Sequence, residues 1–153
     1  MIFTILVMMI LTYLSIYAYY TTKNLKILKE DAFFYCTNLE EMELPKSLES
    51  IEKSAVSNCY KLKGEVVLPN VKTIGVIAFG GSKEIKSVTL SAEGKVIDDR
   101  AFSGCEKLEN VVFSGSTEYM GNTILEGTKW YDNQPNGFIY FENVLYKYKG
   151  EMP

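Results

Sequence analysis

The chain has 153 residues, of which 47% are hydrophobic and 23% are charged, so it is long enough for one folded domain with a modest core. Its formal net charge of −3 gives no reason to expect a nucleic-acid partner, because nucleic-acid-binding domains usually carry a strongly basic surface. Histidine is absent from the sequence, which excludes every catalytic triad or dyad that needs an imidazole.

The first segment, Met1–Tyr20, contains no charged side chain. As a helix it would be about 30 Å long, enough to cross the hydrocarbon core of a membrane. We interpret residues 1–24 as a transmembrane helix or signal segment. Three alternatives stay open: an uncleaved signal anchor, a cleavable signal peptide, and a truncation scar ahead of lost repeats. Lys23, Lys26 and Lys29 follow, and the positive-inside rule would place them in the cytoplasm, which conflicts with export of the remaining chain.

From residue 25 onward the sequence repeats with a period of 23 residues. The columns in register are an apolar one (Leu28, Ile51, Ile74, Ile97, Met120), a mainly alanine one (Ala32, Ala55, Ala78, Ala101, Ile124), a mainly aromatic one (Phe33, Val56, Phe79, Phe102, Leu125), a small-residue one (Cys36, Cys59, Ser82, Cys105, Thr128) and a second apolar one (Leu39, Leu62, Ile85, Leu108, Tyr131). A period of this length predicts a solenoid in which each repeat forms one coil.

The second half of each repeat alternates apolar and polar residues, as in Leu39-x-x-Met42-x-Leu44. This LxxLxL pattern is typical of a leucine-rich repeat, whose short strand points alternate residues into the core. The second repeat has one extra residue before its strand, and Gly64 is the position at which we expect a bulge. The first half, with its Ala-Phe pair, is expected to form a short helical or 3₁₀ turn on the outer face. The predicted fold is therefore an α/β-type solenoid over residues 25–128, with 23-residue coils and short strands on the concave face.

One full repeat reads Leu28-Lys-Glu-Asp-Ala-Phe-Phe-Tyr-Cys-Thr-Asn-Leu-Glu-Glu-Met-Glu-Leu-Pro45. This motif resembles the BspA-like leucine-rich repeats, and the resemblance covers roughly residues 25–128. It implies a bacterial surface or secreted protein that takes part in adhesion and protein binding.

The C-terminal region, residues 129–153, is predicted to be a cap built on a β-hairpin. Strand-like runs at 138–141 and 144–148 flank a two-residue turn. A solenoid needs its last coil covered, which favours a lid over the open core. An alternative is an adhesive aromatic patch for sugar or protein, made by Trp130, Tyr140, Tyr146 and Tyr148.

The chemically reactive side chains do not combine into a catalytic or metal site. Three cysteines without histidine or close C-x-x-C spacing do not predict zinc. Cys36, Cys59 and Cys105 are expected to be buried small residues of their column, although neighbouring coils would also permit a Cys36–Cys59 disulfide. Glu41 and Glu43 are expected on a solvated face, with no sign of a cleft. We therefore expect no enzyme, no cofactor and no metal.

The strand face is the predicted binding surface, because solenoids commonly bind partners along it. Its partner-binding candidates, the outward residues of the strands, are Glu41, Glu43, Glu65, Val67, Ser87, Thr89, Asn110 and Val112. The sequence thus predicts a non-enzymatic protein-binding or adhesion module, membrane-anchored through residues 1–20 or secreted, with its repeats outside the cell and a protein or cell-surface macromolecule as partner. The alternative is a truncated structural fragment of a larger repeat protein, with no independent partner.

Overall fold

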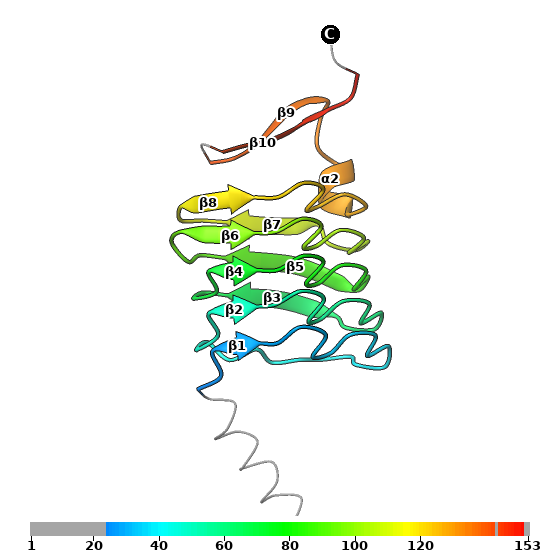
Figure 1. Ribbon diagram of the computed structural model, residues 1–153. Coiled ribbons are helices and arrows are strands. Elements are labelled where there is room, and N and C mark those ends of the chain that lie inside the picture. The colour runs from blue at the N-terminus through cyan, green and yellow to red at the C-terminus, as the bar shows by residue number, and fades with distance from the viewer. Residues whose placement is uncertain (1–23, 143, 152–153) are drawn as a thin grey trace, which may run out of the picture.

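The computed structural model describes residues 24–142 and 144–151 of the chain. Figure 1 shows coils stacked along one axis, with a two-stranded hairpin at the C-terminal end of the stack. The expected membrane or signal segment lies, apart from its last residue, outside the described residues. Among the residues described, no helix is long and apolar enough to cross a membrane.

One side of the solenoid is a five-stranded parallel sheet with the order β1-β2-β4-β6-β8. Its strands are β1 (Ile27–Leu28), β2 (Ser50–Ile51), β4 (Thr73–Ile74), β6 (Lys95–Ile97) and β8 (Thr117–Met120). The apolar column four residues before each alanine lies in register in this sheet, as the pairing of Ile51 with Ile74 and of Ile74 with Ile97 shows. Sequence patterning did not predict the sheet, because strands of two to four residues are too short to show an alternation.

The other side is a three-stranded parallel sheet with the order β3-β5-β7. It is made by β3 (Gly64–Leu68), β5 (Ile85–Leu90) and β7 (Asn110–Phe113), which are the predicted leucine-rich-repeat strands of coils two, three and four. The inward side chains of β5, Ile85, Val88 and Leu90, are fully buried. The pattern of alternate residues therefore predicted this sheet correctly for three coils.

Coil one does not contribute a fourth strand to this sheet, which corrects the sequence prediction. Residues 41–44 belong to no strand, whereas β3 pairs only with β5. The physical reason is the extra residue of coil two. The register shifts between Gly64 and Glu65, and Gly64 has a φ of 101°, so the predicted bulge is confirmed and displaces β3 from the coil before it.

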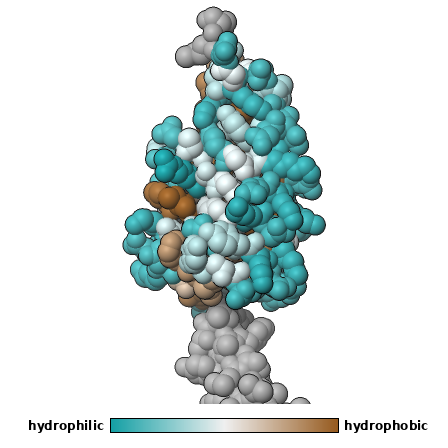
Figure 2. Space-filling view, turned by 90° about the vertical axis from the view of Figure 1, so that its right-hand side faces the viewer, coloured by the Kyte–Doolittle hydropathy of each residue, from teal (hydrophilic) through white to brown (hydrophobic). Residues whose placement is uncertain are grey.

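The Ala-Phe half of each coil is a series of tight turns, so the described coils form a β-solenoid of about four turns and not an α/β solenoid. Ser54 and Asn58 have φ values of 53° and 58°, and the equivalent residues of the next coil, Ile77 and Gly81, have 57° and 72°. Two left-handed residues four positions apart interrupt any right-handed helix. Figure 2, which looks onto this turn side, shows a mainly hydrophilic surface whose hydrophobic atoms gather toward the N-terminal end.

The core is formed by the predicted columns. Ala55, Ala78 and Ala101 are completely buried, and the rings of Phe79 and Phe102 stack at a centroid distance of 5.2 Å. Ala32, which belongs to the same column, is exposed because it lies in the first described coil. Small side chains in the alanine column allow the turns to approach the sheets closely, while the phenylalanines fill the space between coils.

The small-residue column has a hydrogen-bonding role that its burial alone does not reveal. The Ser82 hydroxyl donates to the Val56 carbonyl at 2.7 Å and accepts the Cys59 amide at 3.1 Å. The thiols of Cys59 and Cys105 likewise donate to a carbonyl of the preceding coil, each at 3.1 Å. Serine and cysteine are therefore interchangeable here. All three cysteines are free, so the alternative Cys36–Cys59 disulfide is not formed.

The hairpin of β9 (Gly137–Phe141) and β10 (Val144–Lys149) is antiparallel and follows the short helix α2 (Lys129–Asp132). Phe141 joins it to the solenoid, because its ring lies 4.8 Å from that of Phe113 and 5.0 Å from that of Trp130. The Tyr146 hydroxyl accepts the Leu125 amide at 3.2 Å and donates to Glu126 at 3.0 Å. The hairpin therefore covers the last coil, as its predicted role as a lid requires (Figure 1).

Candidate functional site

The structure brings six of the eight candidate binding residues together on the outer face of β3, β5 and β7. They form two rows across the three strands, Glu65–Ser87–Asn110 and Val67–Thr89–Val112. Val67 and Val112 are 54% and 51% exposed, and the central Ser87 and Thr89 are half-buried. Parallel pairing fixes these side chains on one surface, since residues two apart on a strand point to the same side.

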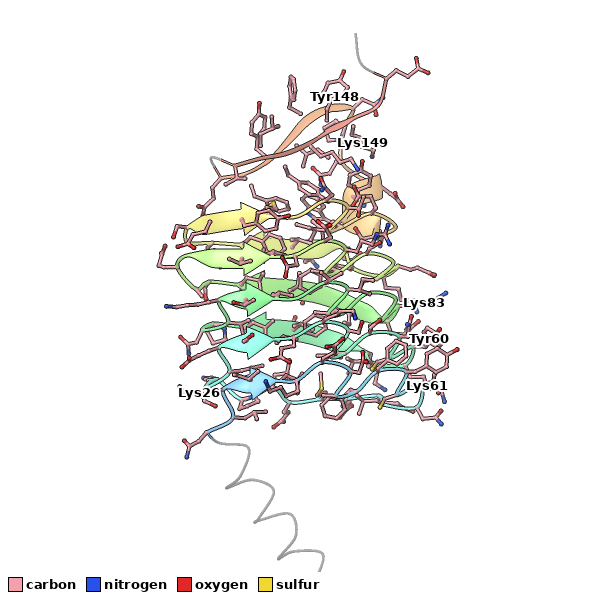
Figure 3. The ribbon with its side chains drawn as sticks, viewed as in Figure 1. Lys26, Tyr60, Lys61, Lys83, Tyr148 and Lys149 are labelled. Carbon is pink, nitrogen blue, oxygen red and sulfur yellow. The ribbon has the colours of Figure 1, made fainter. Side chains whose placement is uncertain are left out.

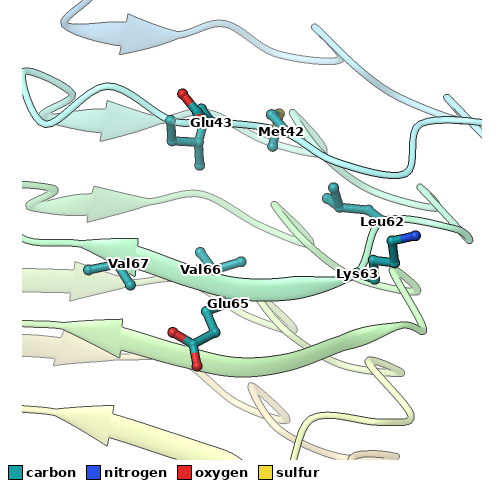
Figure 4. Close-up of a pocket in the computed structure, with 8 residues that line it drawn as sticks. Met42, Glu43, Leu62, Lys63, Glu65, Val66 and Val67 are labelled. Carbon is teal, nitrogen blue, oxygen red and sulfur yellow. The ribbon is translucent and has the colours of Figure 1, made fainter.

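The other two candidates, Glu41 and Glu43, are exposed but do not lie on this sheet. They belong to the unpaired stretch of coil one, beside a cavity of 280 Å³ that separates that stretch from β3. Figure 4 shows Met42 and Glu43 on one side of the cavity and Val66 and Val67 on the other. Glu43 therefore lines a groove between two coils, and neither glutamate continues the rows of the sheet.

The groove also includes residues that the sequence did not single out. Met42, Leu44, Leu62 and Val66 supply its apolar walls. The repeat pattern had assigned Met42, Leu44 and Leu62 to the core. Leu62 and Val66 are buried. The only sequence signal for the groove was the extra residue at Gly64, which disturbs the alignment of coils one and two.

Ion pairs between neighbouring coils dominate the electrostatics of the surface, and most of them join residues 23 apart. The pairs among the described residues are Lys26–Glu49, Lys29–Glu52, Glu30–Lys53, Glu40–Lys63, Lys83–Glu106, Glu84–Lys107, Glu109–Lys129 and Glu126–Lys147. Hydrogen bonding to Lys63 lowers the pKa of Glu40, and the pKa of Glu49 is lowered in the same way by Lys26. In Figure 3, Lys83 lies near Tyr60 on the turn side, with its ammonium 6.0 Å from the ring centroid.

Three glutamates of the candidate site stand outside these columns of paired charges. Glu41, Glu43 and Glu65 form no ion pair with any residue that the structure describes. Lys63, the lysine that lines the groove, is already paired with Glu40 at 3.1 Å. Glu43 and Glu65 therefore bring to the groove two carboxylates without an ion-pair partner among the described residues.

The reactive side chains of the described residues are placed for structural roles. No group of three or more cysteine or carboxylate side chains that could hold a metal occurs in this part of the chain. Burial raises the pKa of the Cys105 thiol to about 12, so this thiol is protonated at neutral pH and is a poor nucleophile. Burial, and then the neighbouring Asp99, raise the pKa of Asp98. The Asp99 carboxylate itself accepts the Asn122 amide at 2.7 Å.

The aromatic residues named as an alternative patch divide into two groups. Trp130 of α2 and Tyr146 of β10 pack against the core. Tyr140 is 56% exposed on the outer surface of the hairpin, where Phe138 contacts Tyr148 at a centroid distance of 5.1 Å. The lid and the exposed aromatic surface are thus opposite sides of one hairpin.

Comparison with known families agrees with this architecture. The family model for the BspA type leucine rich repeat region matches residues 10–131, in 6 copies, and so begins before residue 25, the start of the repeats in the sequence pattern. No curated protein and no solved structure matches the chain. Solenoids of this kind are typically non-enzymatic scaffolds that mediate protein interactions, and this family is typically associated with the bacterial surface. Because the match spans well over half of its length, the chain belongs to the BspA-type leucine-rich repeat family.

Proposed function

We propose that the chain is a non-enzymatic protein-binding or adhesion module displayed on the outer surface of the cell. Its binding surface would be the exposed face of β3, β5 and β7, extended by Glu41 and Glu43. The observation that carries this proposal is the pair of rows in register, which combines exposed valines with polar and acidic side chains on a rigid sheet. Three strands at about 4.8 Å spacing make a narrow surface, which suits a modest interface.

The proposed organisation has three parts: residues 1–24 tether the protein, residues 25–128 form the solenoid and residues 129–153 close it. Two of the lysines that follow the tether have partners inside the solenoid. Lys26 pairs with Glu49 at 2.5 Å, and Lys29 pairs with Glu52 at 3.0 Å. Because these lysines form ion pairs between coils, we give them little weight as a signal for membrane orientation. An outward-facing solenoid is compatible with them.

Exposure on the cell surface can be tested by labelling one introduced cysteine. Ser87 would be replaced by cysteine on the exposed face, and the three native cysteines by serine. Ser82 already occupies their column with the same hydrogen bonds, so the serine background should fold. We expect a membrane-impermeant maleimide to label intact bacteria expressing the full chain. Labelling only after lysis would contradict surface display.

The binding face can be tested with a matched pair of double variants. Val67→Lys/Val112→Lys places charge on the proposed face, and Thr73→Lys/Tyr119→Lys places it at exposed positions of the opposite sheet. Adhesion of bacteria expressing each variant to immobilised extracellular-matrix proteins would be compared with that of the unchanged protein. We expect about a tenfold loss for the first variant only, because the exposed apolar contacts of the face would be replaced by charge. Equal adhesion by both variants would contradict the assignment of the face.

A further inference from the structure

Strand β3 has one free edge, because the solenoid is continuous on one side of coils one and two and open on the other. On the closed side, β1 pairs with β2. On the open side the Lys63 amide donates to the Glu40 carbonyl at 3.1 Å, and the Asn70 side chain donates to the Lys46 carbonyl at 2.8 Å. Between these two contacts, no backbone hydrogen bond joins the described residues of coil one to β3.

The free edge lies beside the 280 Å³ groove, which Glu65, Val66 and Val67 of β3 line. Exposed strand edges accept an added strand readily, since main-chain hydrogen bonds supply affinity and neighbouring pockets select side chains. Apolar walls from Met42, Leu44 and Val66 lie on both sides of the opening (Figure 4). A β-carbon built at Gly64 would meet no atom within 4 Å, so the start of the edge is unobstructed.

Charge identifies the kind of segment that would fit. Glu43 and Glu65 line the groove without ion-pair partners among the described residues, while Lys63, which also lines it, is paired with Glu40. An inserted strand that carries lysine or arginine at alternate positions would meet these carboxylates. Its intervening apolar residues would meet the walls of the groove.

We propose that an extended, cationic segment of a partner protein adds as a strand to the free edge of β3, in the groove between coil one and coil two. This inference rests on the proposed protein-binding function and specifies the partner. Two other occupants fit less well. The chain's own Met1–Tyr20 segment has no charged side chain to match the glutamates, and a second copy of β3 would bring the same glutamates into repulsion.

The test uses synthetic peptides and the full chain, kept in solution with a non-ionic detergent. The probe is a fluorescent decapeptide that alternates lysine with valine or threonine. One control replaces lysine by glutamate, and another keeps the sequence but methylates alternate backbone nitrogens. We expect micromolar binding of the cationic probe, at least about tenfold weaker binding of both controls, and slower hydrogen exchange in β3 when the probe is bound. Equal binding of the methylated peptide would overturn strand addition, since that peptide cannot form the ladder of hydrogen bonds.

Two charge-reversal variants locate the site. Glu43→Lys/Glu65→Lys should weaken the cationic probe about tenfold or more, whereas Glu118→Lys/Glu151→Lys, with the same charge change at exposed positions elsewhere, should not. An equal loss of probe affinity in both variants would show that binding depends only on net charge, and would overturn the proposal. In a different outcome, the unchanged chain binds no peptide but associates with itself, and Glu43→Lys/Glu65→Lys abolishes that association. This result would overturn the proposal, because the occupant of the groove would be a second copy of the chain. If adhesion still depends on Val67 and Val112 when no peptide binds, this inference fails and the proposed function stands.

Discussion

Ile77 has a backbone conformation that β-branched residues rarely adopt. Its φ is 57°, and the equivalent positions of the other coils are filled by Asp31, Ser54, Arg100 and Thr123 with φ between 53° and 58°. Left-handed geometry costs a residue with a β-carbon roughly 1–2 kcal/mol, and asparagine tolerates it better than isoleucine does. The conformation is imposed by the coil, because every repeat has it whatever its side chain.

Replacing Ile77 by asparagine should therefore stabilise the protein. Ile77→Asn is expected to raise the free energy of unfolding by about 1 kcal/mol, measured by urea denaturation followed by circular dichroism. Ile77→Val is the control, because it keeps the β-branch and the strain and should give no gain. An asparagine variant less stable than the valine variant would show that contacts of the isoleucine side chain outweigh its strain.

Among the elements, the C-terminal hairpin depends on one buried hydroxyl. The Tyr146 hydroxyl bonds to both Leu125 and Glu126 of the last coil. Tyr146→Phe should lower the free energy of unfolding by about 1–2 kcal/mol, because it leaves a buried amide without its acceptor.

The matched control for this change is in the same hairpin. Tyr148→Phe loses only an exposed contact with the Glu151 carbonyl and should be neutral within about 0.5 kcal/mol. Thermal unfolding of the two variants would measure the difference. Equal stability of both would mean that aromatic packing alone holds the lid on the last coil.

The sequence predicted the elements that its alternation could reveal. Ile85, Val88 and Leu90 specified β5 to the residue, and the extra residue at Gly64 marked the bulge. The sheet that begins with β1 was missed because strands of two residues produce no period. The Ala-Phe segments were expected to form short helical or 3₁₀ turns. Their backbone bonds do join residues three apart, as from the Ala55 amide to the Glu52 carbonyl, but left-handed residues such as Ser54 cannot be recognised from residue type.

The candidate face was predictable in part for the same reason. Val67, Thr89 and Val112 share a row because alternation and the 23-residue period fix both the side and the register of each strand. The groove could not be predicted, since it depends on how far coil one separates from β3. Glu43 was therefore expected on the sheet and instead lies beside the groove.

At the scale of the whole molecule, columns of ion pairs make stability depend on pH and salt. Hydrogen bonds from lysines lower the pKa of Glu40, Glu49, Glu52 and Glu109 below the ordinary value of 4.5. A carboxylate with a lowered folded-state pKa stabilises the protein above its unfolded pKa and loses that contribution as the pH falls through the folded value. The stabilising effect is therefore present at neutral pH and disappears in acid below 4.5.

We expect the unfolding temperature to be nearly constant from about pH 7 to pH 5 and to fall between about pH 4.5 and pH 3. About 0.5 M salt should lower the unfolding temperature at neutral pH and reduce its decrease in acid, because the ion pairs are exposed and salt screens them. Scanning calorimetry at low and high salt would measure both effects. A transition temperature that does not change with pH or salt would show that the columns contribute nothing to stacking.

The separation between coils one and two also has a mechanical consequence. Later coils are joined by both sheets. Coil one is joined to coil two by β1 and by backbone bonds of the turn side, such as that from the Phe33 amide to the Ala55 carbonyl, but by only two isolated contacts on the side of β3. A pulling force along the stack is therefore expected to separate coil one from coil two before it separates the later coils. Unravelling one 23-residue coil would release roughly 80 Å of chain while β3, β5 and β7 stay folded, so the first coil would take up a pull on the N-terminal side before the proposed binding face is disturbed.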